Sequence, residues 1–305
     1  MSASRRVLVT GAGGFIGRPL LADLRARGFE VHAVTSREPP PSDDPVRWHR
    51  ADLLAADSAE AVVAATGPTH LLHLAWYTEH GRYQASAKNL SWAAATLRLA
   101  QHFAAAGGRR AVLAGTCAEY RWGDPGRLSE ASTPLEPATP YGASKGATWA
   151  MLEAAAGELG IELAWGRIFF CYGQGEAPGR LVPSVVRSLL EGERIATPPG
   201  DRLRDFLHVE DVAGAFAQLL EGSVAGAVNI ASGEPTPLSE IVTAAAEAAG
   251  RADLLEAGAP AARPGEPREL VADVTRLREE VGFRPAVSLE EGMAKTVAWW
   301  GENLR

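Results

Sequence analysis

The chain has 305 residues, a formal net charge of −7 and no run of basic side chains, so we expect no nucleic-acid partner. Its hydrophobic and charged fractions, 46% and 22%, are typical of a globular protein with room for one large domain or two modest ones. No apolar stretch reaches the roughly 20 residues of a membrane span. The opening MSASRRVLVTG also lacks a signal-peptide core, so we expect no membrane and a cytoplasmic location.

The first 170 residues alternate short apolar runs with helical patterns. The runs predict strands over residues 5–11, 29–36, 46–53, 69–76, 109–116 and 161–170. The helical patterns predict helices over residues 15–28, 58–67, 82–106 and 141–159. Strands that alternate with helices are joined by right-handed crossovers into parallel sheets. We therefore expect a doubly wound α/β domain over residues 1–170.

The pattern loosens after residue 170, where glycine and proline become frequent. Short helices are predicted over residues 209–221, 237–249 and 288–301, between brief strands. We expect residues 171–305 to form a smaller α+β portion that binds substrate at the carboxyl edge of the sheet. This portion is expected to interleave with the first domain, without a clean linker.

A glycine-rich turn, VTGAGGFIG, places Gly11, Gly14 and Gly17 between the first strand and the first helix. Glycines allow a tight turn and bring the helix N-terminus close to the pyrophosphate of a dinucleotide. A glycine-rich turn without a ligand is the alternative, but the strand–turn–helix context favours a dinucleotide-binding domain of the Rossmann type. Phe15 and Ile16 of the same turn are counted among the cofactor-binding residues.

The end of the second strand indicates which dinucleotide binds. An acidic residue there would hold the adenosine ribose of NAD, but the sequence has Ser36 and Arg37 in VTSRE. An arginine can pair with a 2′-phosphate, although it can also be an exposed loop residue, and Glu38 lies beside it. The sequence therefore favours NADP(H), with NAD(H) possible.

The third strand ends in the dipeptide Asp52–Leu53. Asp52 could accept a hydrogen bond from the adenine amino group, or it could cap a helix. Both residues are assigned to the cofactor site.

The segment TPYGASK places Tyr141 four residues before Lys145, one helical turn apart. A solvated pair at a helix start is one interpretation, and Pro140 suits a first helical turn. The other is an acid–base pair. A free tyrosine titrates near pH ~10, and a nearby cation favours the phenolate and lowers that value.

Thr116 ends the fifth predicted strand, and with it the chain resembles a known family. The motifs that carry the resemblance are TGAGGFIG, HLAW, GTCAEY, YGASK, GRIFFCYGQGE, RDFLHVEDVA, NIASGEP and RPGEPRELVAD. In this order they resemble the extended short-chain dehydrogenase/reductases, in the nucleotide-sugar epimerase/dehydratase branch. The resemblance covers nearly the whole chain, and it is more specific for the family than for the reaction.

The resemblance implies a role for each matching residue. Tyr141 matches the catalytic tyrosine, and Lys145 matches the lysine that holds the nicotinamide ribose and lowers the tyrosine pKa. Thr116 matches the residue that hydrogen-bonds the reacting sugar oxygen. Leu74 and Ala75 are expected to line the cofactor.

The substrate implied by the resemblance is a nucleotide-diphosphate sugar. Arg204 and Arg263 match arginines that contact the diphosphate, although a salt bridge to Asp205 or Asp211 is the plainer interpretation of Arg204. The other residues expected near the sugar are Trp76, Tyr77, His80, Asn89 and Cys117.

Three departures from the family pattern bear on the reaction. Sugar 4,6-dehydratases usually carry an Asp-Glu pair after the catalytic threonine, but this chain has Cys117 and Ala118, which cannot transfer those protons. Glu119 comes one position later and is expected to point to the other side of an extended segment. Phe170 replaces an asparagine that often helps to seat the sugar nucleotide.

Two reactions remain, together with a reading that involves no catalysis. The missing acid after the second strand favours an NADPH-dependent 4-ketoreductase, with Tyr141 as proton donor, over an NAD-dependent 4-epimerase. HLAWYTEHGRY and GTCAEY also resemble deoxysugar 4-ketoreductases that make sugars of the CDP-abequose or CDP-paratose type. A non-catalytic NADP-binding regulator is the third reading, disfavoured because Thr116, Tyr141 and Lys145 are all present.

Two further expectations concern partners. The alanine-rich helices over residues 82–106 and 141–159 match a pair that forms a four-helix bundle across a two-fold axis in the family, so a homodimer is expected. His73, His80 and His208 have no metal-ligand spacing, and polar packing is expected for them instead of a metal site.

Overall fold

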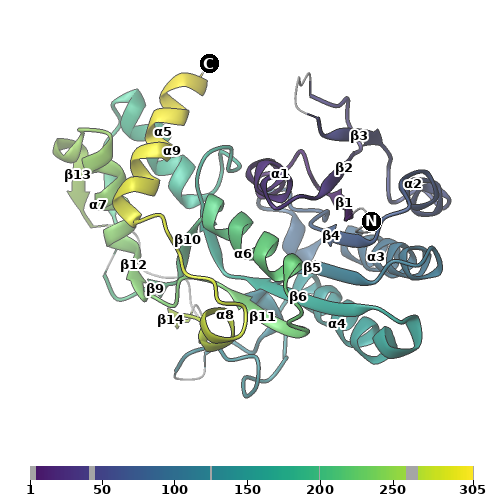
Figure 1. Ribbon diagram of the computed structural model, residues 1–305. Helices are drawn as coiled ribbons and strands as arrows, with labels where there is room; N and C mark the ends of the chain where they lie inside the picture. Colours follow the sequence, from purple (N-terminus) through teal and green to yellow (C-terminus); the bar gives the residue numbers. More distant parts are fainter. Residues whose placement is uncertain (1–4, 41–44, 124–125, 199, 259–266, 305) are drawn as a thin grey trace.

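The computed structural model describes residues 5–40, 45–123, 126–198, 200–258 and 267–304 (Figure 1). Seven parallel strands form one sheet in the order β11-β6-β5-β4-β1-β2-β3. Their bounds are β1 Arg6–Thr10, β2 Glu30–Thr35, β3 Arg47–Arg50, β4 His70–His73, β5 Arg110–Thr116, β6 Glu162–Ile168 and β11 Gly226–Ile230. The predicted α/β class with a doubly wound parallel sheet is confirmed.

Helices cover both faces of this sheet (Figure 1). On one face lie α1 (Gly17–Ala26) and α6 (Val209–Glu221), and on the other lie α2 (Ser58–Thr66), α3 (Lys88–Ala105) and α4 (Pro140–Leu159). Strand β1 shows why the sheet must be covered twice, because Val7 and Val9 pack into one core and Leu8 into the other. Such continuous apolar runs are typical of strands buried on both faces.

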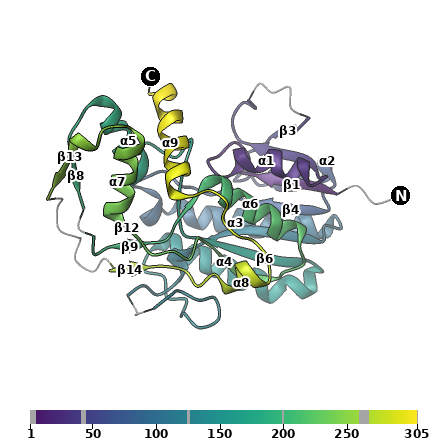
Figure 2. The same cartoon turned by 60° about the vertical axis from the view of Figure 1, so that its left-hand side comes forward.

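The C-terminal part forms a second layer of helices beside the sheet, seen from the side in Figure 2. Its core lies between three helices, α5 (Leu181–Glu191), α7 (Leu238–Ala248) and α9 (Leu289–Asn303). Short strands pair around it: β7 Phe170–Tyr172 with β10 Phe206–His208, β8 Ile195–Thr197 with β13 Leu255–Ala257, and β9 Leu203–Arg204 with β12 Thr236–Pro237 and β14 Glu269–Leu270. The short helix α8 (Thr275–Glu279) precedes α9.

The structure differs from the predicted elements in three places. Strand β11 joins the large sheet beside β6, although its residues follow position 170; the division of the chain at that position stays a prediction. The predicted strand 161–170 is two strands, β6 and β7, which belong to different sheets. The predicted helix 82–106 begins only at Lys88, after a short 3-10 turn at Tyr83–Ala85.

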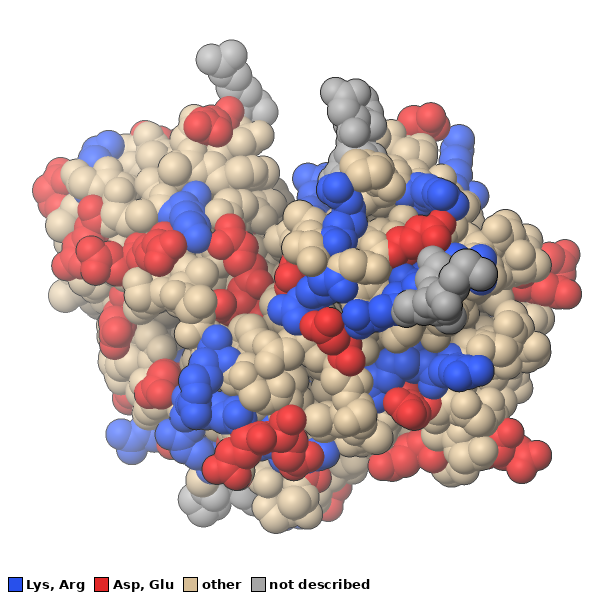
Figure 3. Space-filling model, viewed as in Figure 1, with Lys and Arg blue, Asp and Glu red and all other residues tan. Residues whose placement is uncertain are grey.

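The surface carries both signs of charge. Figure 3 shows acidic and basic side chains interspersed on the face viewed, with a hollow between the part that carries α7 and α9 and the part that carries β1–β3. No helix among the described residues combines the length and the apolar composition needed to cross a membrane.

Candidate active site

The candidate residues gather where the parallel strands end. Thr10 at the end of β1 pairs with His73 at the end of β4, and Thr116 ends β5 beside β6. The loops that follow these strands therefore meet at one edge of the sheet, where ligands bind in open α/β sheets.

The glycine loop after β1 is tightly packed against the loop after β4. Gly11 has a φ of +71°, and a Cβ atom there would lie 2.8 Å from the backbone nitrogen of Ala75 and 2.9 Å from the carbonyl carbon of Leu74. Only glycine suits this conformation and this spacing. The loop is closed by a hydrogen bond from the Gly14 N–H to the Gly11 carbonyl (2.9 Å), and α1 starts at Gly17 with no acidic residue in its first turn. This cradle fits an anionic group such as a pyrophosphate.

The end of β2 leaves an arginine in solvent. Ser36 and Arg37 are exposed, while Glu38 makes an ion pair with Arg50 at 3.4 Å. Arg37 donates its backbone N–H to the Thr35 hydroxyl. The Glu38 carboxylate beside Arg37 is thus paired with Arg50.

The residues after β3 show a turn. The exposed Asp52 carboxylate accepts a hydrogen bond from the Leu54 N–H (3.0 Å), so Asp52 caps this turn, whereas the N-cap of α2 is Asp57. Leu53 is buried.

Thr116 and Tyr141 are brought together by the start of α4. Thr139 caps this helix through a hydrogen bond from the Gly142 N–H to its hydroxyl (3.2 Å), and Pro140 occupies the first turn. The Tyr141 phenol then lies near the Thr116 hydroxyl, which acts to lower the pKa of that phenol. Its ring meets the ring of Tyr83 edge to face, with centroids 4.9 Å apart.

Lys145 lies one turn further along α4 and is 3% exposed. Its Nζ donates to the carbonyl of Ala114 in β5 at 2.6 Å and lies 3.9 Å from the centre of the Trp76 ring. Burial lowers the pKa of Lys145 to about 7, while the Glu119 carboxylate acts in the opposite direction. A lysine in this state can both bind as a cation and exchange a proton near neutral pH.

The pKa of Tyr141 corrects one implication of the resemblance. The resemblance implied a pKa lowered by Lys145, but burial, reinforced by Tyr83, raises it, and the nearby Thr116 hydroxyl offsets this only in part. The physical reason is that the loss of solvent around the phenol is the largest effect on its pKa. The phenol therefore keeps its proton at neutral pH.

Asn89 supports the loop that follows β4. Its side chain is fully buried, accepts from the Trp76 indole N–H (2.8 Å) and donates to the carbonyls of Tyr83 (2.6 Å) and Ser86 (2.9 Å). Asn89 thereby fixes Trp76 over Lys145. Its predicted contact with the substrate stays a prediction.

The rest of this loop meets the segment after β7. Tyr77 donates to Glu79 (2.7 Å), and the exposed His80 lies against Gly179. The Arg180 guanidinium lies 5.1 Å from the centre of the Tyr83 ring. The two segments therefore close over the side of the site where Tyr141 lies.

The sequence placed three further residues near the substrate. Cys117 is buried, and burial raises its pKa to about 12, so its thiol stays neutral. Arg204 is also buried and donates to the carbonyls of Leu203 (2.8 Å) and Arg268 (3.3 Å), with its guanidinium 5.7 Å from the Phe170 ring. Arg263 lies outside the described residues.

Sequence reasoning missed a buried hydrogen-bond chain under the site. His73 bonds to Thr10 through Nδ1 (2.7 Å) and to Thr96 through Nε2 (2.8 Å). Burial and the nearby Lys145 lower the pKa of His73 to about 3, so the ring is neutral. This is the polar packing expected of His73, and no group of three or more His, Cys, Asp or Glu among the described residues could hold a metal. Its partners could not be foreseen, because they lie on β1 and α3.

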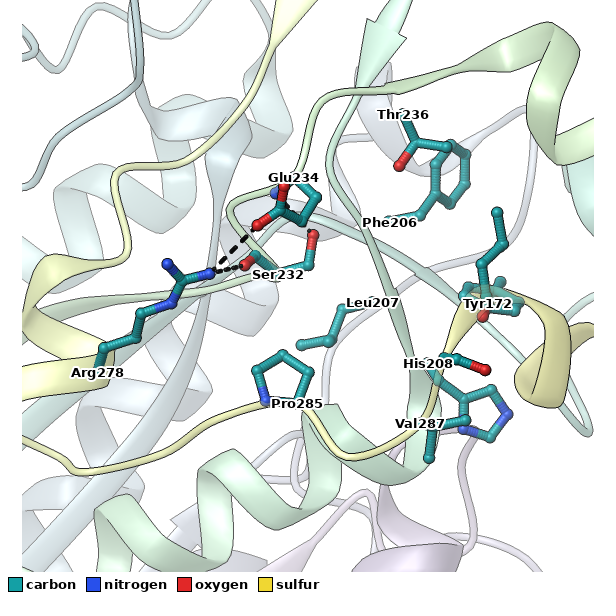
Figure 4. Close-up of a pocket in the computed structure, with 12 residues that line it drawn as sticks. Tyr172, Phe206, Leu207, His208, Ser232, Glu234, Thr236, Arg278, Pro285 and Val287 are labelled. Atoms are coloured by element: carbon teal, nitrogen blue, oxygen red, sulfur yellow. Dashed lines mark hydrogen bonds and ion pairs between the residues drawn. The ribbon is translucent and has the colours of Figure 1, made fainter.

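A cavity of about 320 Å³ lies in the C-terminal part (Figure 4). Arg278 borders it, donating to the Ser232 carbonyl (2.8 Å) and pairing with Glu234 (3.5 Å), and Tyr172 and His208 also line it. None of the predicted site residues within the described part of the chain lines this cavity.

Comparison with known proteins gives consistent matches along the chain. A sequence profile described as the NAD dependent epimerase/dehydratase family matches residues 7–231. The dTDP-glucose 4,6-dehydratase of Streptomyces griseus is 30% identical over 97% of this chain and 94% of its own length. The GDP-6-deoxy-D-mannose reductase of Pseudomonas aeruginosa is 29% identical, with 99% of each chain covered.

A solved structure adds an enzyme named for a third reaction. The UDP-glucose 4-epimerase of Thermus thermophilus in complex with NAD matches with a TM-score of 0.82 and 29% identity, over 97% of this chain and 98% of that chain. These proteins are named for three different reactions at almost equal identity. Identity therefore does not select the reaction, and the site residues must be considered.

Proposed function

The chain belongs to the NAD dependent epimerase/dehydratase family, and from its site we propose that it reduces a nucleotide-linked 4-keto sugar at carbon 4 with NADPH. Membership makes the protein an NAD(P)-dependent enzyme of the extended short-chain dehydrogenase/reductase type. The reading as a non-catalytic regulator is therefore dropped.

The observation that carries the proposal is the raised pKa of Tyr141. Reduction of a ketone requires a proton donor at the carbonyl oxygen, whereas oxidation of an alcohol requires a base. A half-buried phenol that keeps its proton suits the first task. Tyr141 donates this proton to the oxygen at carbon 4, and the nearby Thr116 hydroxyl orients that oxygen.

The other residues bind and neutralise charge. The bound dinucleotide supplies the hydride. The glycine loop and the N-terminus of α1 bind the pyrophosphate, and Lys145 binds the nicotinamide ribose and stabilises the phenolate that remains after proton transfer. Solvent then returns a proton to Tyr141. The same site offers no acid at Cys117 or Ala118, and the Cys117 thiol stays neutral, which argues against dehydration by that route.

An NAD-dependent 4-epimerase is the second candidate, favoured by the likeness to the UDP-glucose 4-epimerase that holds NAD. The deciding experiment offers a panel of nucleotide-linked 4-ketosugars with NADPH and follows the nicotinamide absorbance. We expect NADPH oxidation and a new hydroxyl at carbon 4. Interconversion of nucleotide-linked 4-hydroxy sugars without net oxidation of NADPH would instead support the epimerase.

The exposed Arg37 predicts a cofactor preference. Wild type is expected to bind NADP(H) more tightly than NAD(H), and Arg37→Ala to lose at least about tenfold in NADP(H) affinity while keeping NAD(H) affinity, because charge-assisted bonds to a 2′-phosphate are lost. Fluorescence titration of both reduced cofactors measures this. Arg50→Ala, a neighbouring exposed arginine, is the control and should keep the preference. A wild-type preference for NAD(H) would move the assignment to the epimerase.

Two exposed apolar side chains support a homodimer. Helices α3 and α4 pack on each other, and they carry Leu90 (70% exposed) and Met151 (57% exposed). We expect a dimer at micromolar concentration by light scattering, and a monomer in the double variant Leu90→Glu, Met151→Glu, because burying two carboxylates is costly. Leu135→Glu, an exposed leucine outside both helices, should stay dimeric. A monomeric wild type would contradict the prediction.

A further inference from the structure

A buried carboxylate lies directly behind the proposed catalytic residues. Glu119 has no exposed surface, and it ends a 3-10 turn, Cys117–Glu119, that follows β5. The sequence predicted an extended segment here with Glu119 facing away, and that prediction is wrong. The turn is capped in both directions: the Thr116 hydroxyl accepts from the Ala118 N–H (3.3 Å), and Glu119 Oε1 accepts from the Thr116 N–H (2.8 Å).

The remaining partners of Glu119 come from β6. The Trp165 indole N–H donates to both carboxylate oxygens (2.9 and 3.1 Å), and Arg167 Nε donates to Oε2 (2.8 Å). Arg167 is itself 1% exposed and also donates to the Tyr120 hydroxyl (3.1 Å). Because every one of these groups is buried, the carboxylate is held in a single position.

One glycine makes room for the carboxylate, and a second lies beside it. A Cβ atom on Gly115 would lie 2.7 Å from Glu119 Oε1 and would collide with the Trp165 indole. On the other side, a Cβ atom on Gly146 of α4 would lie 3.9 Å from Glu119 Cγ, in ordinary contact. Glu119 thus packs against α4 at the residue that follows Lys145.

Trp165 links Glu119 to Lys145. Its indole N–H is bound by Glu119, and its ring centre lies 5.7 Å from Lys145 Nζ. The other groups around Lys145 are the Trp76 ring, the neutral His73 on β4 and the protonated Tyr141 on the same helix. Glu119 is the carboxylate that counteracts the effect of burial on Lys145.

We propose that Glu119 is a positioning residue of this site, which fixes Thr116 through the backbone and faces the Lys145 ammonium across the Trp165 indole. The inference rests on the proposed function, since it assigns Lys145 to the nicotinamide ribose. Glu119 does not touch the substrate. Its negative charge increases the protonated fraction of Lys145 at neutral pH, and its hydrogen bond with the Thr116 N–H holds the backbone that carries the Thr116 hydroxyl.

The pH dependence of cofactor binding tests this role without a sugar substrate. NADPH and NADH affinities are measured by nicotinamide fluorescence between pH 5.5 and 9.5, in steps of about half a unit. In wild type the affinity should fall as Lys145 loses its proton. In Glu119→Gln, which keeps an acceptor for Thr116 but removes the charge, this fall should move to lower pH by about one unit. In Arg167→Met, which removes the compensating cation, it should move to higher pH.

Two controls separate charge from structure. Tyr120→Phe removes a hydroxyl from the same cluster without changing charge, and its midpoint should not move. Lys145→Met should lose the pH dependence, which identifies the titrating group. If Glu119→Gln does not fold, as judged by its unfolding transition, the upward shift in Arg167→Met decides.

The outcomes are distinct. Shifts in opposite directions for Glu119→Gln and Arg167→Met support the inference, because a purely structural role would weaken binding in both at every pH. Equal midpoints in the folded variants would overturn it. A wild type that binds neither dinucleotide would instead overturn the proposed function.

Discussion

Tyr141→Phe is expected to lower turnover of a nucleotide-linked 4-ketosugar by about 10²- to 10⁴-fold, the usual effect of losing a positioned general acid. The substitution removes one hydroxyl. The ring is held by the edge-to-face contact with Tyr83, and this contact survives in phenylalanine. Single-turnover rates with NADPH measure the loss.

Cofactor affinity and stability should change little in this variant. The ring stays in place and only one hydroxyl group is removed. Tyr172→Phe is a matched control, because this phenol lies on β7 and lines the cavity in the C-terminal part, away from the predicted site residues. Wild-type turnover by Tyr141→Phe would exclude Tyr141 as the proton donor and the mechanism with it.

Local sequence patterns predicted most of the fold because each element carries its own signal. The alternating strands and helices up to β6 appear in order, and helix 209–221 has the predicted bounds. Strand β11 was missed as a member of the large sheet because a strand of five residues does not indicate which strand it pairs with. Sheet membership is a property of the tertiary fold.

Those candidate site residues that lie in a local sequence motif could be predicted from the sequence. Gly11 and the pair Tyr141–Lys145 could be found in this way, and the structure places Thr116 beside Tyr141. Glu119 was misplaced because its orientation depends on a 3-10 turn and on donors from β6, which no local pattern reveals. The direction of the Tyr141 pKa was wrong for a similar reason, since it depends on how far the tertiary fold removes the phenol from solvent.

Lys145→Met should reduce turnover by about 10²- to 10³-fold, as expected when a preorganised charge near a developing oxyanion is removed. It should also weaken NADPH binding by about tenfold, because charge-assisted bonds to the ribose are lost. This combined loss distinguishes Lys145 from Tyr141, whose removal should affect turnover alone. Turnover and nicotinamide fluorescence titration, measured on the same preparations, provide the two values.

Loss of the Lys145 proton should increase the free energy of unfolding, whereas it should weaken cofactor binding. The folded pKa of Lys145, about 7, lies below the value of ~10.4 for a free lysine. Between these values the unfolded chain binds more protons than the folded one, so this residue makes the free energy of unfolding rise with pH from about 7 to about 10. Below pH 7 the ammonium is buried at full cost, offset by the Ala114 carbonyl and the Trp76 ring.

Lys145→Met keeps a side chain of similar length without the charge, so this part of the pH dependence should vanish in thermal unfolding measured from pH 6 to 10. An unchanged pH dependence in the variant would mean that folding does not lower the pKa of Lys145, and the titration of Lys145 near pH 7, on which the role of Glu119 depends, would lose its physical basis.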